Sequence, residues 1–257
     1  MTLKIEQLTG GYCPIPVLKN VNFDVNNGEI VGLIGLNGAG KSTTIKNIIG
    51  LLTPTKGEIT IDDLTLQATP EAYRKQIGYI PETPSLYEEL TLREHIEITA
   101  MAYDIPTEEA FKRAEDLLAL FRLENKLEWF PANFSKGMKQ KVMVLCAFLI
   151  EPSLYIIDEP FLGLDPLAIN ALLELMDQMR QQGAAILMST HILATAEKYC
   201  DRFVVLHNGE VRAQGTMAEL RQEFNLPDSS LDEIYVALTK EADLEKTQQQ
   251  NKLEAHK

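Results

Sequence analysis

The sequence is poor in cysteine, with three residues in 257, at Cys13, Cys146 and Cys200. They lie far apart, and no two of them form the CxxC spacing of a metal pair. Their number and spacing therefore exclude a disulfide framework and fit a reducing cytosol. Cys146 lies in an apolar run, and we interpret it as a small core residue.

Long apolar runs and positive charge are also scarce. No stretch of about 18 apolar residues is present, so we expect no membrane-spanning helix, and the N-terminal residues lack a signal-peptide pattern. Lysine and arginine number 24 against 37 aspartates and glutamates, which gives a net charge of −13. Because phosphate backbones bind basic surfaces, this balance disfavours nucleic acid as a partner.

A glycine-rich loop at Gly35–Ser42 is the most informative feature that is present. It has a glycine, four residues, then Gly-Lys-Ser, which is the pattern of a phosphate-binding loop. Glycines let the backbone turn and direct successive N–H groups at one anion. Lys41 is placed to reach the β- and γ-phosphates of ATP, and Ser42 offers a hydroxyl to Mg²⁺. The residues expected to hold the nucleotide are Asn37, Gly38, Ala39, Gly40, Lys41, Ser42 and Thr43.

The flanking residues strengthen this interpretation. An apolar run at 29–34 predicts a buried strand before the loop, and residues 43–51 predict a helix after it. The alternative is an ordinary glycine-rich turn, which does not require this order of elements. A helix that begins at the loop adds its positive N-terminal end to the anion site.

The remaining periodicity predicts an α/β fold. Alternating runs predict a small antiparallel layer from strands at 3–8, 21–25 and 57–62. Asn208-Gly209 predicts a two-residue hairpin turn. Further strands are expected at 77–80, 154–157, 184–188, 203–207 and 210–213.

Between these strands the pattern changes to that of helices. We expect a helical insertion at about 84–150, inside a main domain at 2–225. A C-terminal extension at 226–257 should be frayed after about 240, because few apolar residues occur there. The expected architecture is a phosphate-loop α/β core with an antiparallel β layer and a helical insertion subdomain.

Two carboxylates follow the apolar strand at 154–157. Asp158 is placed to hold Mg²⁺ through water, and Glu159 to orient or deprotonate an attacking water. An Asp-Glu pair alone is common, but its place after an apolar strand favours this role. His191 follows the strand at 184–188, at the edge where nucleotides bind in α/β sheets, and can hydrogen-bond the γ-phosphate. The alternative is a structural histidine.

A second anion site is predicted at Ser135 and Gly137, at the start of a helix over 138–150. The alternative is that Ser135 only caps that helix. Because a helical segment separates these residues from the phosphate loop of the same chain, a second copy is better placed to bring them to ATP. The sequence thus predicts a homodimer around two ATP molecules.

Taken together, the motifs of residues 2–220 resemble those of ABC transporter ATPase subunits, a group of P-loop NTPases. The resemblance rests on the phosphate loop and on the segments SKGM, IIDEP, GLD and STH, in this order. Several segments are similar, more narrowly, to the ATPases of Ecs-type exporters of Gram-positive bacteria. These are residues 10–12, 80–84, 129–131, 134–140 and 161–166.

The resemblance implies further roles for single residues. Tyr12 matches the aromatic residue that stacks on adenine, although it is otherwise a plain surface tyrosine. Ser135 and Gly137 match residues that contact the γ-phosphate held by the opposite subunit. Asp165 matches a loop aspartate that crosses the dimer interface, and His191 matches the switch histidine.

Three positions depart from the family pattern. Lys136 and Met138 replace glycine and glutamine in the signature segment. Glu82 stands where most relatives have the glutamine that senses Mg²⁺ and contacts the membrane subunit. A carboxylate can also ligate Mg²⁺, but it adds repulsion near Asp158 and Glu159.

The resemblance implies ATP hydrolysis that drives an exporter through a separate transmembrane permease subunit, at the cytoplasmic face of the cell membrane. We expect the permease to dock between Glu82 and the helical insertion, unless the aromatic residues there belong to the core. The candidates are Leu86, Tyr87, Trp129 and Phe130. The alternative function is a soluble ABC ATPase that acts on ribosomes or DNA. It is less favoured because the chain has a single cassette and no heptads.

Overall fold

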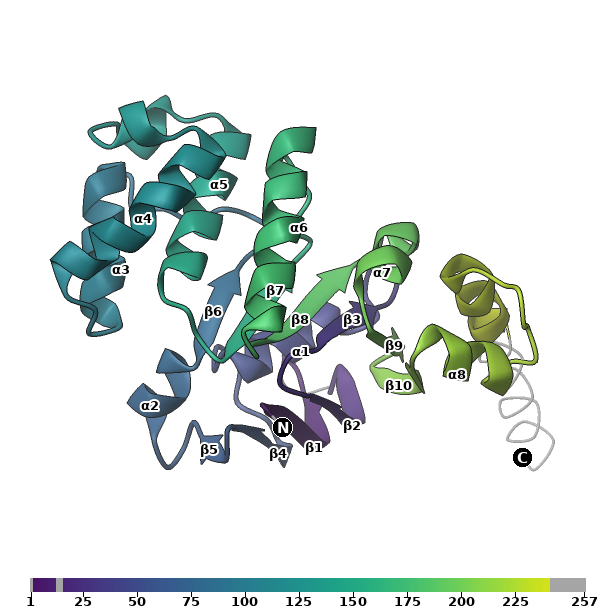
Figure 1. Ribbon diagram of the computed structural model, residues 1–257. Helices are drawn as coiled ribbons and strands as arrows, with labels where there is room; N and C mark the ends of the chain where they lie inside the picture. The colour runs from purple at the N-terminus through teal and green to yellow at the C-terminus, as the bar shows by residue number, and fades with distance from the viewer. Residues whose placement is uncertain (1, 13–15, 241–257) are drawn as a thin grey trace.

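Two β-sheets form the frame of the protein (Figure 1). The computed structural model describes residues 2–12 and 16–240. Within them, one sheet has the strand order β2-β1-β4-β5, and the other has the order β10-β9-β3-β8-β7-β6. The expected phosphate-loop α/β core with an antiparallel layer and inserted helices is confirmed.

The smaller sheet is the predicted antiparallel layer. It consists of β1 (Leu3–Gly10), β2 (Leu18–Val25), β4 (Lys56–Ile61) and β5 (Leu64–Thr65). Each neighbouring pair runs antiparallel. Apolar side chains from β1, β2 and β4 pack in one cluster with those of the central sheet, so the layer covers one face of that sheet.

The central sheet brings the loops of the predicted site to one edge. Its strands are β3 (Ile30–Ile34), β6 (Ile77–Ile80), β7 (Leu154–Asp158), β8 (Ala185–Thr190), β9 (Arg202–His207) and β10 (Glu210–Gly215). From β9 to β6 all pairs are parallel, and β10 pairs antiparallel with β9. Every residue of β3, β7 and β8 is buried. Because parallel strands end at the same edge, the loops after β3, β7 and β8 meet there.

The β9–β10 hairpin touches this edge. Asn208 and Gly209 have φ angles of 53° and 81°, so the predicted two-residue turn is of the left-handed kind that Asn-Gly favours. The Gly209 N–H donates to the Ala39 carbonyl at 2.9 Å. A Cβ atom at Gly209 would lie 1.7 Å from the Val17 oxygen, so no side chain fits at this turn. The hairpin therefore supports the phosphate loop from outside.

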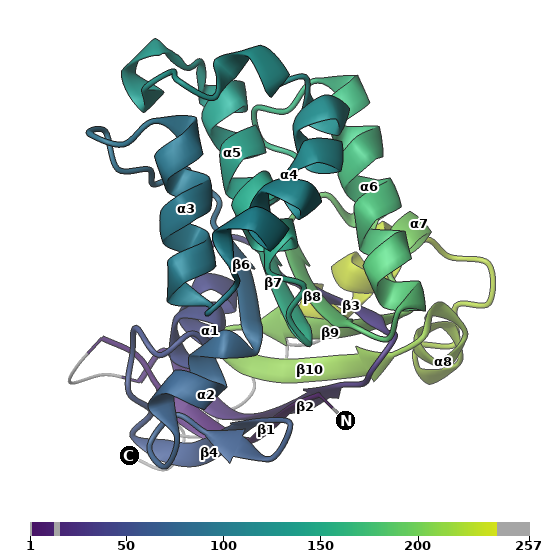
Figure 2. The same cartoon turned by 60° about the vertical axis from the view of Figure 1, so that its left-hand side comes forward.

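The helices cover the other face of the central sheet. Figure 2 shows α3, α4 and α5 side by side next to β6, with α6 beside them. Their apolar residues form one cluster with β7 and β8, so the inserted helices share the core of the sheet. The helices are α1 (Lys41–Ile48), α2 (Pro70–Lys75), α3 (Leu92–Ala102), α4 (Thr107–Phe121), η1 (Glu124–Lys126), η2 (Pro131–Asn133), α5 (Lys136–Leu149), α6 (Pro166–Gln181), α7 (Leu193–Tyr199) and α8 (Met217–Glu223).

Some element ends differ from the predictions. The helix after the phosphate loop begins at Lys41 and the signature helix at Lys136, two residues earlier than expected in each case. Ser189 and Thr190 belong to β8, because their backbones continue its ladder with β3. Residues 231–240 are helical, and the predicted fraying after about 240 concerns residues outside the described part. The domain limits at 2–225 and about 84–150 remain predictions.

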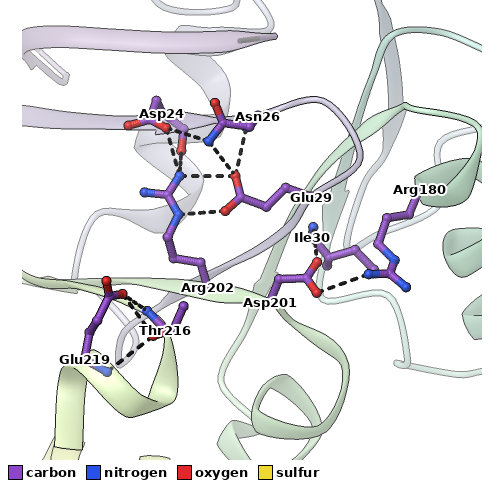
Figure 3. A network of polar contacts seen from close by, with 9 residues as sticks. All are labelled: Asp24, Asn26, Glu29, Ile30, Arg180, Asp201, Arg202, Thr216 and Glu219. Atoms are coloured by element: carbon purple, nitrogen blue, oxygen red, sulfur yellow. Dashed lines mark hydrogen bonds and ion pairs between the residues drawn. The ribbon is translucent and has the colours of Figure 1, made fainter. Parts of the chain in front are cut away.

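A polar network joins the two sheets (Figure 3). Arg202, at the start of β9, donates to Asp24 on β2 at 2.9 Å and to Glu29 at 2.8 Å. Asp201 accepts from the Ile30 N–H at 2.8 Å. These bonds fix the antiparallel layer to the central sheet at the end opposite the phosphate loop.

Candidate functional site

The phosphate loop has the geometry that its sequence predicts. Gly38 and Gly40 adopt φ angles of 83° and 115°, where a side chain would be strained. A Cβ atom at Gly35 would lie 2.7 Å from the Leu206 oxygen. The Ala39 N–H donates to the Leu36 carbonyl at 3.0 Å. The glycines therefore permit a tight turn that directs its amides outward at the start of α1.

Lys41 is a buried cation at this turn. Its ammonium group donates to the Gly35 carbonyl at 2.6 Å. Burial lowers the pKa of Lys41, while the nearby charges of Glu159, Asp158 and Glu82 oppose that change. The structure thus brings the loop lysine close to all three predicted carboxylates. A phosphate that replaces the carbonyl as the partner of Lys41 would complete its charge pairing.

Asp158 lies at the end of β7, and its carboxylate is short of positive charge. Its Oδ1 accepts a hydrogen bond from the Ser189 hydroxyl. Burial raises the pKa of Asp158, the Ser189 bond lowers it, and the Glu82 and Glu159 charges raise it again, so the net direction is upward. The same surroundings raise the pKa of Tyr79 to about 12, chiefly through burial. A cation bound here would relieve this repulsion.

Glu159 and His191 meet directly. The Glu159 Oε2 atom lies 2.8 Å from the His191 Nδ1 atom and accepts from the Thr190 hydroxyl at 3.3 Å. Glu159 has a left-handed φ of 47°, and its N–H donates to the Ser189 carbonyl at 3.0 Å. Non-glycine residues in this conformation are often held there for function. The strained turn and the histidine together fix the carboxylate at the sheet edge.

Oxygen ligands for a metal are present in part. Ser42 is exposed in the first turn of α1, Asp158 is buried nearby, and Glu82 is exposed at the end of β6. Residues 2–12 and 16–240 contain no group of three or more His, Cys, Asp or Glu side chains that would hold a metal alone. A hydroxyl and carboxylates fit Mg²⁺, which takes its remaining ligands from nucleotide phosphates and water.

The signature residues form a second group. The Ser135 hydroxyl accepts from the Met138 N–H at 3.2 Å, so within one chain it caps α5. A Cβ atom at Gly137 would lie 2.4 Å from the Gly163 oxygen, so this position requires glycine. Asp165 caps α6 and lies 2.7 Å from the Lys141 ammonium on α5. The contacts therefore join Ser135, Gly137 and Asp165 to one another through α5, and not to the phosphate loop.

Tyr12 lies at the surface beside α1. Its side chain is 54% exposed, and its hydroxyl accepts from the Lys46 ammonium at 2.8 Å. The same ammonium lies 5.4 Å from the centre of the Tyr12 ring. An exposed aromatic ring one turn from the phosphate loop fits the predicted adenine platform, which remains a prediction.

Several supporting residues were missed by the sequence analysis. Ser189 and Thr190 orient Asp158 and Glu159, and their presence in an otherwise apolar strand was a signal for them. Gln140 is buried on α5 and donates to the Pro81 carbonyl at 3.2 Å, directly before Glu82. Nothing in the sequence marks that contact, because 59 residues separate its partners.

Comparisons with known proteins agree with this geometry. The family model described as "ABC transporter" matches residues 18–162. The ABC-type transporter ATP-binding protein EcsA of Bacillus subtilis (strain 168) is 64% identical over 93% of this chain and 97% of its own length.

The chain belongs to the ABC transporter family.

Other relatives and solved structures give the same result for this ABC ATPase. The Nod factor export ATP-binding protein I of Rhizobium meliloti (strain 1021) is 36% identical over 84% of the chain and 64% of its own length. A solved ATP-binding subunit of an ABC transporter superposes with a TM-score of 0.91, at 61% identity over 93% of this chain and all of the other. The dimeric, post-hydrolysis cassette MJ0796, bound to ADP and Pi, superposes with a TM-score of 0.76 at 28% identity, over 84% of this chain and 98% of that one.

The protein is therefore the ATP-binding and ATP-hydrolysing subunit of an ABC transporter. None of the comparisons favours the alternative of a soluble ATPase acting on ribosomes or DNA. Among residues 2–12 and 16–240, no helix is both long and apolar enough to cross a membrane.

Proposed function

We propose that two copies of the ABC ATPase close around two Mg²⁺–ATP and drive an exporter through a separate permease. The observation that carries this proposal is the meeting of Lys41, Asp158, Glu159 and His191 at one sheet edge. Glu159, held by His191, takes a proton from the attacking water, and Lys41 and the loop amides bind the phosphates. Mg²⁺, held by Ser42, Asp158 and Glu82, would neutralise phosphate charge.

The dimer is supported by residues that lack a partner role within one chain. Ser135, Gly137 and Asp165 have the capping and packing contacts described above, yet the Ser135 and Asp165 side chains remain open to a second subunit. Apolar side chains beside the motifs are also exposed. These are Leu36 in the phosphate loop, Leu167 after Asp165 and Ile192 after His191. A second copy that covers them would bury this apolar area as it completes each ATP site.

The permease is proposed to dock where the inserted helices meet the core. A hollow of about 280 Å³ lies between the end of α1, α2, β6 and the end of α3. Leu51 lines it with 69% of its side chain exposed. Its lining consists of Ile49, Leu51, Arg74, Ile77, Tyr79 and Tyr103. An apolar cytoplasmic segment of the permease would fit such a hollow, and Arg74 offers it one charged contact.

The four docking candidates from the sequence divide into two kinds. Leu86 is half-buried against the core of the inserted helices, whereas Tyr87 and Phe130 are exposed. Trp129 stacks on Phe134 with ring centres 6.5 Å apart, under the Lys126 ammonium at 3.3 Å. We propose that the exposed members extend the docking surface. This arrangement would place the ATPase on the cytoplasmic face of the cell membrane.

Membrane recruitment tests the docking surface. With the permease co-expressed, Leu51→Glu and Trp129→Asp should move the ATPase from membranes to the supernatant, while both variants stay folded and hydrolyse ATP. Unfolding of Trp129→Asp would instead mean that Trp129 is a core residue. Membrane binding unchanged in both folded variants would contradict the docking surface.

Glu82 tests the departure from the family pattern. Glu82→Gln should keep ATPase activity, since an amide oxygen also ligates Mg²⁺. Glu82→Ala should weaken stimulation of ATPase activity by the permease. Full stimulation in the alanine variant would contradict a coupling role for Glu82.

A further inference from the structure

The phosphate loop is held at Leu36 by a residue from the other end of the chain. The Leu36 N–H donates to the hydroxyl oxygen of Tyr235 at 2.9 Å, across 199 positions of sequence. The Leu36 carbonyl accepts from the Ala39 N–H at 3.0 Å. The Leu36 side chain is 60% exposed and gives the loop little packing. The backbone of Leu36 is therefore fixed by these two hydrogen bonds.

Tyr235 is itself firmly placed. Its side chain is 5% exposed and belongs to an apolar cluster with Ile34, the last residue of the strand before the loop. The helical residues 231–240, beyond α8 in Figure 1, add Leu231, Ile234 and Leu238 to this cluster. The Leu231 N–H also donates to Glu197 on α7 at 2.9 Å, so the segment contacts the helix that follows His191.

We infer that Tyr235 is a positioning residue for ATP, which keeps the phosphate loop in its binding conformation before the nucleotide arrives. A loop that is already ordered loses less conformational freedom on binding, so the affinity for the nucleotide rises. Tyr235 lies outside residues 18–162, which match the family model. The C-terminal extension thereby contributes to the site of the same subunit.

The protonation state of Tyr235 agrees with this role. Burial raises the pKa of its phenol, and the Leu36 hydrogen bond lowers it by less, so the hydroxyl stays protonated at neutral pH. A neutral hydroxyl oxygen accepts the Leu36 N–H without adding a negative charge beside the phosphates.

The test is the nucleotide affinity of Tyr235→Phe in the full chain, measured by calorimetry with Mg²⁺–ATP and with Mg²⁺–ADP. Phenylalanine keeps the ring packing and removes the acceptor. We expect both dissociation constants to rise by about three- to tenfold, the usual effect of one hydrogen bond. The KM for ATP should rise equally while kcat changes less, and the Leu36 amide should exchange with solvent faster.

Tyr73→Phe is the matched control. Tyr73 is also buried, and its hydroxyl donates to the Ile48 carbonyl at 2.8 Å, at the far end of α1. It should lose a similar amount of stability and keep its nucleotide affinity. An unchanged affinity in Tyr235→Phe, or an equal loss in Tyr73→Phe, would overturn the inference. Because a single subunit suffices, the result does not depend on the proposed permease or dimer.

Discussion

The protein contains two acidic clusters that carry opposite electrostatic signatures. At one end of the sheets, Asp24 and Glu29 share the Arg202 guanidinium. At the phosphate loop, Asp158 and Glu159 share the neighbourhood of Lys41. Burial raises the pKa of Glu29, but bonds from Arg202 and Asn26 outweigh it and leave the pKa lowered. The pKa of Asp158 is raised.

The difference lies in where each cation spends its hydrogen bonds. Arg202 directs Nε to Glu29 and Nη2 to Asp24, and its fork suits two carboxylates at once. Lys41 gives its printed bond to the Gly35 carbonyl and acts on the carboxylates only through space. The first cluster is neutralised by the protein itself. The second retains a charge imbalance that a bound cation and nucleotide can resolve, which is the mark of a site rather than a brace.

Glu159→Gln should give the largest effect of any change in this comparison. The amide keeps the shape of the side chain but cannot accept the proton of the attacking water, so ATPase activity should fall by about 10²- to 10⁴-fold. Nucleotide binding should persist, and the ATP-bound protein should elute as a dimer in size-exclusion chromatography.

The control for this prediction is the structural cluster. Glu29→Gln makes the same chemical change in the other acidic group and should leave the turnover of folded protein intact. Normal turnover in Glu159→Gln would show that the base has been assigned wrongly.

Arg202→Met tests the brace. Methionine keeps much of the apolar stem but leaves Asp24 and Glu29 unneutralised between the two sheets. The side chains of this cluster are 17–30% exposed. The expected loss therefore lies between those of surface and buried ion pairs, about 2 kcal/mol of unfolding free energy. Thermal or urea unfolding measures it.

Arg180→Met is the comparison for that loss. Arg180 pairs with Asp177 and Asp201, whose side chains are 51% and 42% exposed. Its removal should cost about 1 kcal/mol or less, because exposed pairs are screened by water. Equal losses in the two variants would mean that Arg202 does not brace the sheets.

The same contrast separates what the sequence predicts from what it does not. Gly35–Ser42, Asp158, Glu159 and His191 lie in short motifs attached to strand ends, so strand periodicity placed them correctly. Arg202 pairs with Asp24 across 178 positions, and no local pattern marks it. Contacts of this kind depend on which strands become neighbours, and the order of β9 next to β3 is a property of the folded sheet.

Tyr235 is a further case. The sequence beyond Leu226 suggested a polar extension, and the apolar residues Leu231, Ile234 and Leu238 were too few to define a periodic helix with certainty. Their burial depends on a groove made by β9, β10 and α8, whose lining residues come from separate segments. The N–H that Tyr235 accepts belongs to the phosphate loop, and backbone groups carry no sequence signature.

Asp158→Asn should make the nucleotide-free protein more stable. The amide still accepts from Ser189 and removes the charge that Glu82 and Glu159 repel. In EDTA at neutral pH we expect a gain of about 1 kcal/mol, or roughly 2–4 °C in the unfolding midpoint. Added Mg²⁺–ATP should then stabilise the variant far less than the wild type. A nucleotide-free variant less stable than the wild type would place Asp158 in a structural role.

The smallest expected effect is a pH dependence that only the brace should show. The folded pKa of Glu29 is lowered from 4.5, so its contribution to stability is fully present above about pH 4.5. It is lost as the pH falls through the folded pKa, because the unfolded chain then binds the proton more readily. The stability difference between wild type and Arg202→Met should therefore shrink by a fraction of about 1 kcal/mol between pH 5 and pH 3. Urea unfolding of both proteins across this range measures the change, and Arg180→Met should show a smaller one. A difference that stays constant with pH would mean that Arg202 stabilises the junction of the sheets by packing of its stem rather than by its charge.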